Sequence, residues 1–221
     1  MRSRDDVIAQ IREAFDRTPS PGAAFLAGSR EGSEPEEVAR AFAPFDHWNQ
    51  PDAATLDRHH DALSFLSEGG FRFFLPAYLI ADLQGTLMTA DPVYHLTHGF
   101  SDRTVRLPFG RKTFEKTVGG SVLLNPRRYG AITFRDAARW RLAVFSREEA
   151  RAIVAYLQYK RDTDAEGLDR DQITAALASY WRDRAAHAPD REALAAHLAR
   201  EAEEFNAVQD ARGGARGPDA P

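Results

Sequence analysis

Apolar residues recur at helical spacing from the beginning of the chain. The first helix is predicted from Asp5 to about Arg17, because its apolar positions follow one another three or four residues apart: Val7, Ile8, Ile11, Ala14 and Phe15. A segment rich in proline and glycine, residues 19–22, ends this helix. Pro35 is predicted to open a second helix, since proline is well tolerated in a first turn. A further short helical segment is predicted over Ala53–Phe65.

The most apolar block of the chain is Phe71–Ile80, with the sequence F-R-F-F-L-P-A-Y-L-I. Ser67 can cap a helix that begins directly after it, and Gly85 can end that helix. Apolar side chains cover most of the cylinder, so we expect this helix at the centre of the fold. Pro76 cannot donate to the carbonyl one turn back, and a kink or a split is therefore predicted there.

The helical period disappears between Gly99 and Ile132. Glycine and proline are frequent in this segment, and strand-like runs occur at Thr104–Leu107, Ser121–Leu124 and Ala131–Phe134. We predict an irregular loop or a small β-hairpin inserted between helices. A connection of this length is uncommon unless it is functional or mobile.

Helical signals return after the insert. Ser146 and Glu149 have the spacing of a capping box, and the helix that they open is predicted to run to about Arg161. Another helix is predicted over Arg170–Ala186. After Pro189 a last helix is indicated by its apolar positions, which are Leu194, Leu198, Ala202 and Phe205.

These patterns predict a mainly α protein, compact around a central proline-kinked helix. We expect a helical core domain over residues 1–161, which includes the insert at 99–132. A C-terminal helical extension, residues 162–210, is expected to pack on it. Residues 211–221 contain almost nothing to bury and are expected to form a disordered tail.

The composition is that of an ordinary folded chain, with 221 residues of which 43% are apolar and 28% charged. Cysteine is absent, which excludes disulfides, thiolate zinc sites and cysteine nucleophiles. No apolar run follows the basic N-terminal residues, as a signal peptide would require. The longest apolar stretch, near residues 71–83, is far shorter than the roughly 20 residues of a membrane span. We expect a cytoplasmic protein.

The charge is unevenly distributed, although the whole chain carries only −4. Between Asp102 and Arg141 ten basic residues stand against three acidic ones, a net charge of +7, which leaves −11 for the rest of the chain. Such asymmetry arises when two parts of one fold attract each other, or when a protein binds an anionic partner. We favour the first interpretation.

Four sequence features occur in an order that resembles a known family. They are Trp48, L-S-F-L-S at Leu63–Ser67, F-R-F-F-L-P-A-Y-L at Phe71–Leu79, and A-I-V-A-Y-L-Q-Y at Ala152–Tyr159. Over roughly residues 5–161 they resemble a small uncharacterised bacterial family, a domain of unknown function. The resemblance implies the helical fold and no activity, ligand or catalytic residue. The insert before Ala131 and the helices after Asp169 depart from it.

The sequence contains no established catalytic or metal-binding motif. His95 and His98 lie one helical turn apart, but no carboxylates complete a metal motif around them, so we predict no metal and no cofactor. The G-x-S-x-G motif of serine hydrolases is absent. Residues 110–113 have the final residues of a phosphate-binding loop without its leading glycine. The catalytic residues, if any, stay unknown.

Two charged residues stand within the apolar block. We expect Asp82 to be exposed or paired with a cation, for which Arg72 is a candidate. Arg72 itself either packs its stem and reaches solvent or a carboxylate, or binds an anionic substrate or partner.

The insert places basic residues beside aromatic ones, which suits an anionic surface or single-stranded nucleic acid. With Arg72, four of these residues form the candidate anion- or partner-binding set: Arg111, Lys112, Arg127 and Arg128. The tryptophans Trp48, Trp140 and Trp181 are expected in the core or at a seam, and Trp181 is also a candidate for an interface.

The sequence thus leaves the function open and favours a non-enzymatic, cytoplasmic, protein-binding or regulatory helical protein. An immunity-type protein, which masks its partner with an acidic surface, is one version of this hypothesis. One alternative is an enzyme acting on an anionic or phosphorylated substrate, between the central helix and the insert. The other is a nucleic-acid-binding protein that uses the basic insert.

Overall fold

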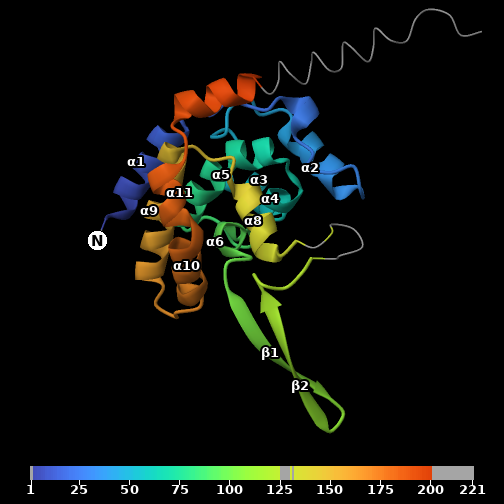
Figure 1. Ribbon diagram of the computed structural model, residues 1–221. Coiled ribbons are helices and arrows are strands. Elements are labelled where there is room, and N and C mark those ends of the chain that lie inside the picture. Colours follow the sequence, from blue (N-terminus) through green and yellow to red (C-terminus); the bar gives the residue numbers. More distant parts are fainter. Residues whose placement is uncertain (1, 125–129, 131, 201–221) are drawn as a thin grey trace, which may run out of the picture.

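The structure, a computed structural model, describes residues 2–124, 130 and 132–200. As predicted, the protein is mainly α, with one small antiparallel hairpin (Figure 1). The helices before the hairpin are α1 (Arg4–Phe15), the short η1 (Ala23–Phe25), α2 (Glu34–Phe42), α3 (Ala53–Arg58), α4 (Ala62–Phe65), α5 (Glu68–Leu83) and α6 (Pro92–Thr97). The hairpin consists of β1 (Asp102–Phe109) and β2 (Lys112–Gly119), and α8 (Phe134–Leu142), α9 (Arg147–Thr163), α10 (Arg170–Ala176), the π-helical turn η2 (Leu177–Trp181) and α11 (Arg182–His187) follow.

Helix α5 is the predicted core helix. The Ser67 hydroxyl caps it by accepting a hydrogen bond from the Gly70 N–H. Of the kink or split predicted at Pro76, the split is wrong, because the helix continues through this residue to Leu83. Buried side chains surround α5 on nearly every side, and this packing outweighs the one backbone hydrogen bond that a proline removes.

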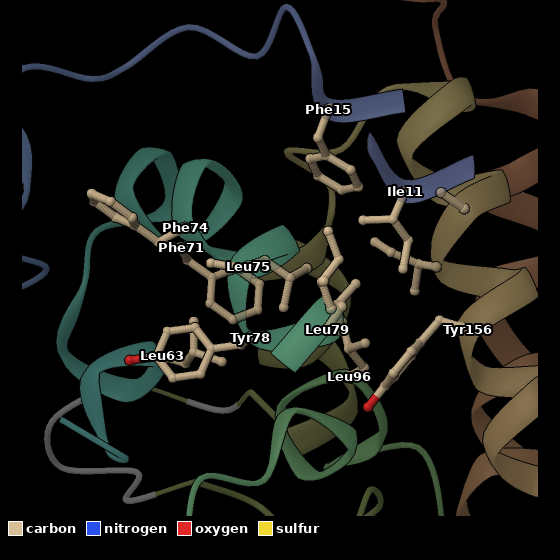
Figure 2. Close-up of a cluster of buried hydrophobic side chains, with 14 of the residues drawn as sticks. Ile11, Phe15, Leu63, Phe71, Phe74, Leu75, Tyr78, Leu79, Leu96 and Tyr156 are labelled. Carbon is tan, nitrogen blue, oxygen red and sulfur yellow. The ribbon is translucent and has the colours of Figure 1, made fainter. Parts of the chain in front are cut away.

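The core forms where other helices pack around α5. Figure 2 shows Ile11 and Phe15 of α1 and Tyr156 of α9 directed toward the α5 side chains that include Leu75 and Leu79. Aromatic rings meet edge to face throughout this core, as in Phe42–Phe74, with ring centroids 4.8 Å apart. The single hydrophobic cluster explains why so many short helices hold together.

Two of the three tryptophans lie in this core, as predicted. The Trp48 indole N–H donates to the carbonyl of Phe15 over 3.0 Å, and that of Trp181 to the carbonyl of Leu96 over 2.8 Å. Trp181 is fully buried, so it is not an interface residue. The expectation for Trp140 was wrong. It lies on the outer side of α8 and is 74% exposed.

Asp82 is paired, but not with Arg72. Its carboxylate accepts from the hydroxyl of Tyr156 over 2.6 Å and from the ammonium of Lys160 over 3.0 Å. Both partners belong to α9, and both project from the same side of that helix, one turn apart. The group therefore ties the end of α5 to the end of α9.

The segment predicted as an irregular loop or a hairpin is a hairpin over Asp102–Gly119. The run Thr104–Leu107 lies in β1, as expected. The run 121–124 and the described residues 132–134 of the other predicted run form no ladder and share one isolated bridge, Leu123 with Thr133. Ala131 lies outside the described residues. Thr133 then caps α8 in a capping box with Asp136, a helix that the weak apolar pattern of residues 134–142 did not indicate.

The C-terminal helices pack on the helical core. The capping box of Ser146 and Glu149 opens α9 as predicted. Helices α10 and α11 both pack against α9, and α10 also packs against α6. Residues 191–200 are helical, whereas the predicted continuation at Ala202 and Phe205 and the tail at 211–221 lie outside the described residues. Within the described part of the chain, no helix has the length and apolar character needed to cross a membrane.

Candidate functional site

The hairpin stands away from the helices (Figure 1), and its turn explains its shape. Phe109 pairs with Lys112, so only Gly110 and Arg111 form the connection. Gly110 has a φ of +61°. A glycine with positive φ at the first loop position is characteristic of the tight turns that match the twist of two antiparallel strands. The turn thus directs the chain straight back along β1.

The register divides the hairpin into two faces of different chemistry, because opposed residues share a face and successive residues alternate. One, the apolar–basic face, consists of Arg103, Val105, Leu107, Phe109, Lys112, Phe114, Lys116 and Val118. The other, the polar face, consists of Thr104, Arg106, Pro108, Thr113, Glu115 and Thr117. The two faces therefore differ as the two sides of an amphipathic sheet do.

The large apolar side chains of the apolar–basic face lie in water. Phe109 is 77% exposed, Phe114 52% and Leu107 47%. Phe109 and Phe114 touch edge to face, with ring centroids 6.3 Å apart. Burying apolar surface is worth roughly 25 cal/mol per Å². Three such side chains together at the end of a projecting element are thus an unused source of binding energy.

The cations differ between the two faces. On the polar face Arg106 forms an ion pair with Glu115, with 2.9 Å between Nε and Oε1. On the other face Arg103, Lys112 and Lys116 form no ion pair with any residue of the described ranges. The apolar–basic face therefore carries uncompensated positive charge beside its exposed rings.

A narrow neck joins the hairpin to the helical body. The Gly120 N–H donates to the carbonyl of Ser101 over 3.1 Å, and the Asp102 carboxylate accepts from both the N–H and the hydroxyl of Ser121. These hydrogen bonds lower the pKa of Asp102. A Cβ at Gly120 would lie 2.4 Å from the carbonyl oxygen of Gly99, so only glycine fits there. The neck is closely packed, which holds the hairpin at its base.

Of the predicted binding residues, the structure brings Arg111 and Lys112 to the tip of the hairpin, where both are exposed. Arg127 and Arg128 lie outside the described residues. Sequence reasoning missed Arg103 and Lys116, and it missed β2 as a strand. The sequence does contain a signal, because cations and apolar residues alternate at every second position along Lys112–Val118. The segment has too few apolar residues, however, to be recognised as a buried strand.

Arg72 does not lie on this surface. Its guanidinium is buried in the core and donates from Nε and Nη2 to the carboxylate of Glu149, at 2.9 to 3.1 Å. The Thr18 hydroxyl and the Ser146 N–H donate to the same carboxylate. The guanidinium is thus engaged by a carboxylate in the interior of the fold.

No group of three or more histidines or carboxylates able to hold an ion occurs in the residues that the structure describes. His95 contacts the rings of Phe71 and Tyr94, and burial, with Arg141 and His98 nearby, lowers its pKa to about 4. A neutral imidazole between aromatic rings indicates packing rather than acid–base chemistry at neutral pH.

A hollow lies between α5, α8 and the segment after the hairpin. The sequence suggests an enzyme site in this region as one alternative. The hollow measures about 500 Å³, and its walls include Leu124, Ile132 and Trp140. Two of the three charged groups at its rim already have partners, since Arg141 donates to the carbonyl of Leu63 and the Asp136 carboxylate accepts from the N–H and the hydroxyl of Thr133. The third is the single carboxylate of Glu68. This hollow therefore offers an apolar wall rather than a set of free catalytic groups.

A second hollow, of about 640 Å³, lies between α1, α9 and the helical residues 191–200. Several of its charged side chains pair with each other or with main-chain carbonyls. Arg147 contacts Asp190 at 3.2 Å, and Arg191 donates to the carbonyl of Ala14 at 2.7 Å. The polar groups of this hollow thus fasten the last described helix to the body.

The fold and the site together define a class of protein: a mainly α body from which a short amphipathic β-hairpin projects. The chain belongs to a family of unknown function (DUF6714), whose model matches residues 3–185. The match extends past Asp169 to residue 185, within α11, so the expectation that the helices after Asp169 depart from the family was wrong up to that residue. The matched range also spans the hairpin. No curated protein and no solved structure matches the chain.

Proposed function

We propose that this protein is a non-enzymatic binding protein that engages a protein partner through the apolar–basic face of its hairpin. The observation that carries the proposal is the exposure of Leu107, Phe109 and Phe114 together on one face of a projecting element. Interfaces between proteins depend on a few apolar or aromatic anchors surrounded by polar groups. Here the rings of Phe109 and Phe114 provide the anchors, and Lys112 and Lys116 are the polar groups that surround them.

The shape of the molecule supports a regulatory role. A hairpin that stands free of its body fits into a cleft of a partner, and the body then blocks access to that cleft. An immunity-type or inhibitory protein would work in this way, although by its basic hairpin and not by an acidic surface. We also propose a cytoplasmic location in a bacterium, in keeping with a chain that has no cysteine.

Affinity purification with the full-length chain from its native host tests the proposal. The test variant is Phe109→Ser with Phe114→Ser, and the matched control on the polar face is Thr104→Ser with Thr113→Ser. We expect the native chain and the control to retain one partner in stoichiometric amount. With the purified partner, the test variant should bind at least about tenfold more weakly. Equal binding by test and control variants would refute the proposal.

A second candidate function rests on Phe109 and Phe114 beside Arg111, Lys112 and Lys116, since aromatic rings next to cations bind single-stranded nucleic acid. It predicts binding of an unstructured oligonucleotide, with an affinity that falls steeply as salt is raised. Fluorescence anisotropy with a labelled oligothymidine measures both. Absence of binding at low salt removes this candidate.

A further inference from the structure

The two edges of the hairpin differ in the hydrogen bonds that they can offer to a third strand. In an antiparallel pair, residues whose N–H and C=O point toward the other strand alternate with residues whose N–H and C=O point outward. The bond from Gly120 to Ser101 identifies one inward pair, and every second pair along the register is therefore also inward. The last of these, Phe109 with Lys112, closes the two-residue turn, as expected.

The outward groups on β1 belong to Asp102, Thr104, Arg106 and Pro108. Pro108 has no N–H, and a proline at an outward position of an edge strand hinders the addition of another strand. The outward groups near the tip of β2 belong to Thr113, Glu115 and Thr117, whose N–H and C=O groups form no hydrogen bond with another residue of the described ranges. The edge of β2 can thus accept a third strand near the tip, whereas Pro108 hinders this on the edge of β1.

The side chains along β2 define what a third strand must bring. On the apolar–basic face the order is Lys112, Phe114, Lys116, Val118, an alternation of cation and apolar residue. Side chains directly opposite on neighbouring strands attract each other when they carry opposite charges or are both apolar. A matching strand therefore presents acidic and apolar residues in turn at every second position.

A second copy of the chain does not meet this requirement. If the β2 strands of two copies paired antiparallel along their outer edges, with Glu115 opposite Glu115, two carboxylates would face each other. In the registers centred on Phe114 or on Lys116, lysine would lie opposite lysine. No register would set a carboxylate opposite Lys112 or Lys116, because this face of β2 carries none. Like charges directly opposite each other destabilise a sheet. The edge is consequently suited to a different chain rather than to itself.

We infer that the outer edge of β2 receives an extended acidic–apolar segment of a partner protein as a third β-strand. The inference rests on the proposed function and specifies the partner chemistry of the same hairpin. Main-chain hydrogen bonds to Thr113, Glu115 and Thr117 supply affinity, and the apolar–basic face supplies specificity. A two-stranded hairpin alone is marginally stable in water, so a third strand also stabilises the hairpin itself.

Random peptides displayed on phage, selected on the full-length chain, provide the probe. We expect the selected peptides to carry Asp or Glu alternating with apolar residues at every second position. In the amide exchange of the complex, the N–H groups of Thr113, Glu115 and Thr117 should become protected, and that of Thr104 should not. Selection of no peptide, or of peptides without this alternation, would overturn the inference.

Two proline variants separate the edges. Thr104 and Thr117 are cross-strand partners, and both N–H groups point outward, so Thr117→Pro and Thr104→Pro each remove one outward donor and no bond within the hairpin. Thr117→Pro should weaken binding of the selected peptide at least about tenfold, whereas Thr104→Pro should leave it within about twofold. Equal effects of the two variants, or a concentration-dependent dimer that only Thr117→Pro abolishes, would contradict strand addition by a partner.

Failure of this inference is distinguishable from failure of the proposed function. When both proline variants bind the natural partner as the native chain does, and Phe109→Ser with Phe114→Ser does not, docking uses the face and not the edge. The inference then fails and the proposed function stands. When the double phenylalanine variant also binds normally, the proposed function fails as well.

Discussion

Arg72 and Glu149 are 77 residues apart in the chain and form a bidentate ion pair in the interior, between α5 and α9. The exposed fractions of their side chains are 7% and 1%. Thr18 adds a hydroxyl from the segment after α1, so that three parts of the fold converge on one carboxylate. The same carboxylate also accepts from the Ser146 N–H in the capping box of α9. Glu149 therefore takes part both in a local helix cap and in a contact between distant elements.

Loss of the Glu149 charge should strongly destabilise the protein. Glu149→Gln leaves the Arg72 guanidinium buried without a counter-charge, and breaking a buried pair in this way costs about 3–5 kcal/mol. Urea unfolding followed by circular dichroism measures the free energy of unfolding. The double variant Arg72→Met with Glu149→Leu should lose less than either Glu149→Gln or Arg72→Met alone. Simple additivity of the single losses would show that the pair does not act as a unit.

Stability should fall as the pH falls toward the folded pKa of His95. Burial, Arg141 and His98 hold this pKa at about 4 in the folded state, against 6.5 ordinarily. The unfolded chain therefore takes up a proton first, and the stabilisation present above pH 6.5 is lost progressively down to about pH 4. The loss is of the order of 2–3 kcal/mol. His95→Gln should flatten the stability curve in this window, and an unchanged slope would contradict the assignment.

Asp57 should control the order of the loop after α5. Its carboxylate accepts from the N–H groups of Met88, Thr89 and Ala90 at 2.7 to 3.2 Å, and these bonds lower its pKa. Asp57→Ala should speed amide exchange at these three positions about tenfold or more.

Asp52→Ala is the matched control for the loop, because this carboxylate caps α3 through Thr55 alone. It should leave the exchange of Met88, Thr89 and Ala90 unchanged. Slow exchange at these three amides in the Asp57 variant would show that other contacts order the loop.

Trp140 should account for most of the fluorescence that acrylamide can quench, because Trp48 and Trp181 are buried. Trp140→Phe should remove this component and change the free energy of unfolding by less than about 0.5 kcal/mol. Trp181→Phe removes the hydrogen bond to the carbonyl of Leu96 and should cost at least about 1 kcal/mol. Strong quenching that persists in the Trp140 variant would mean that a second indole is accessible.

Local signals predicted most of the helices. Ser67 and Ser146 lie directly before the helices that they cap, and the apolar spacing of α1, α5 and α9 gives each its buried side. These features need only a few neighbouring residues to be recognised. The sequence therefore indicated the mainly α fold and its central helix correctly.

Contacts between distant elements were beyond such reasoning. The sequence does not show that Arg72 meets Glu149, or that Asp82 meets Tyr156 and Lys160, because each pair depends on how α5 and α9 pack. The exposure of Trp140 likewise depends on which side of α8 faces outward. Tertiary packing decides these cases, and no local pattern encodes it.

The candidate site was indicated only in part. Arg111 and Lys112 were recognised by charge, but β2 was not recognised as a strand, since a strand that projects into water needs no buried face. The pairing of Lys112–Gly119 with Asp102–Phe109 shows that this segment is a strand. The cross-strand register, and not the composition, separates the apolar–basic face from the polar face.

The neck at Ser101 and Gly120 has a consequence for how this protein can evolve. The chain leaves the helical body and returns to it at one place, so residues can be added to or removed from both strands without altering the course of the helices. Each added cross-strand pair extends the reach of the tip by about 3.3 Å, and steps of two pairs preserve which side chains share a face. Selection can thus adjust how far the hairpin reaches from the body while the hydrophobic core stays the same.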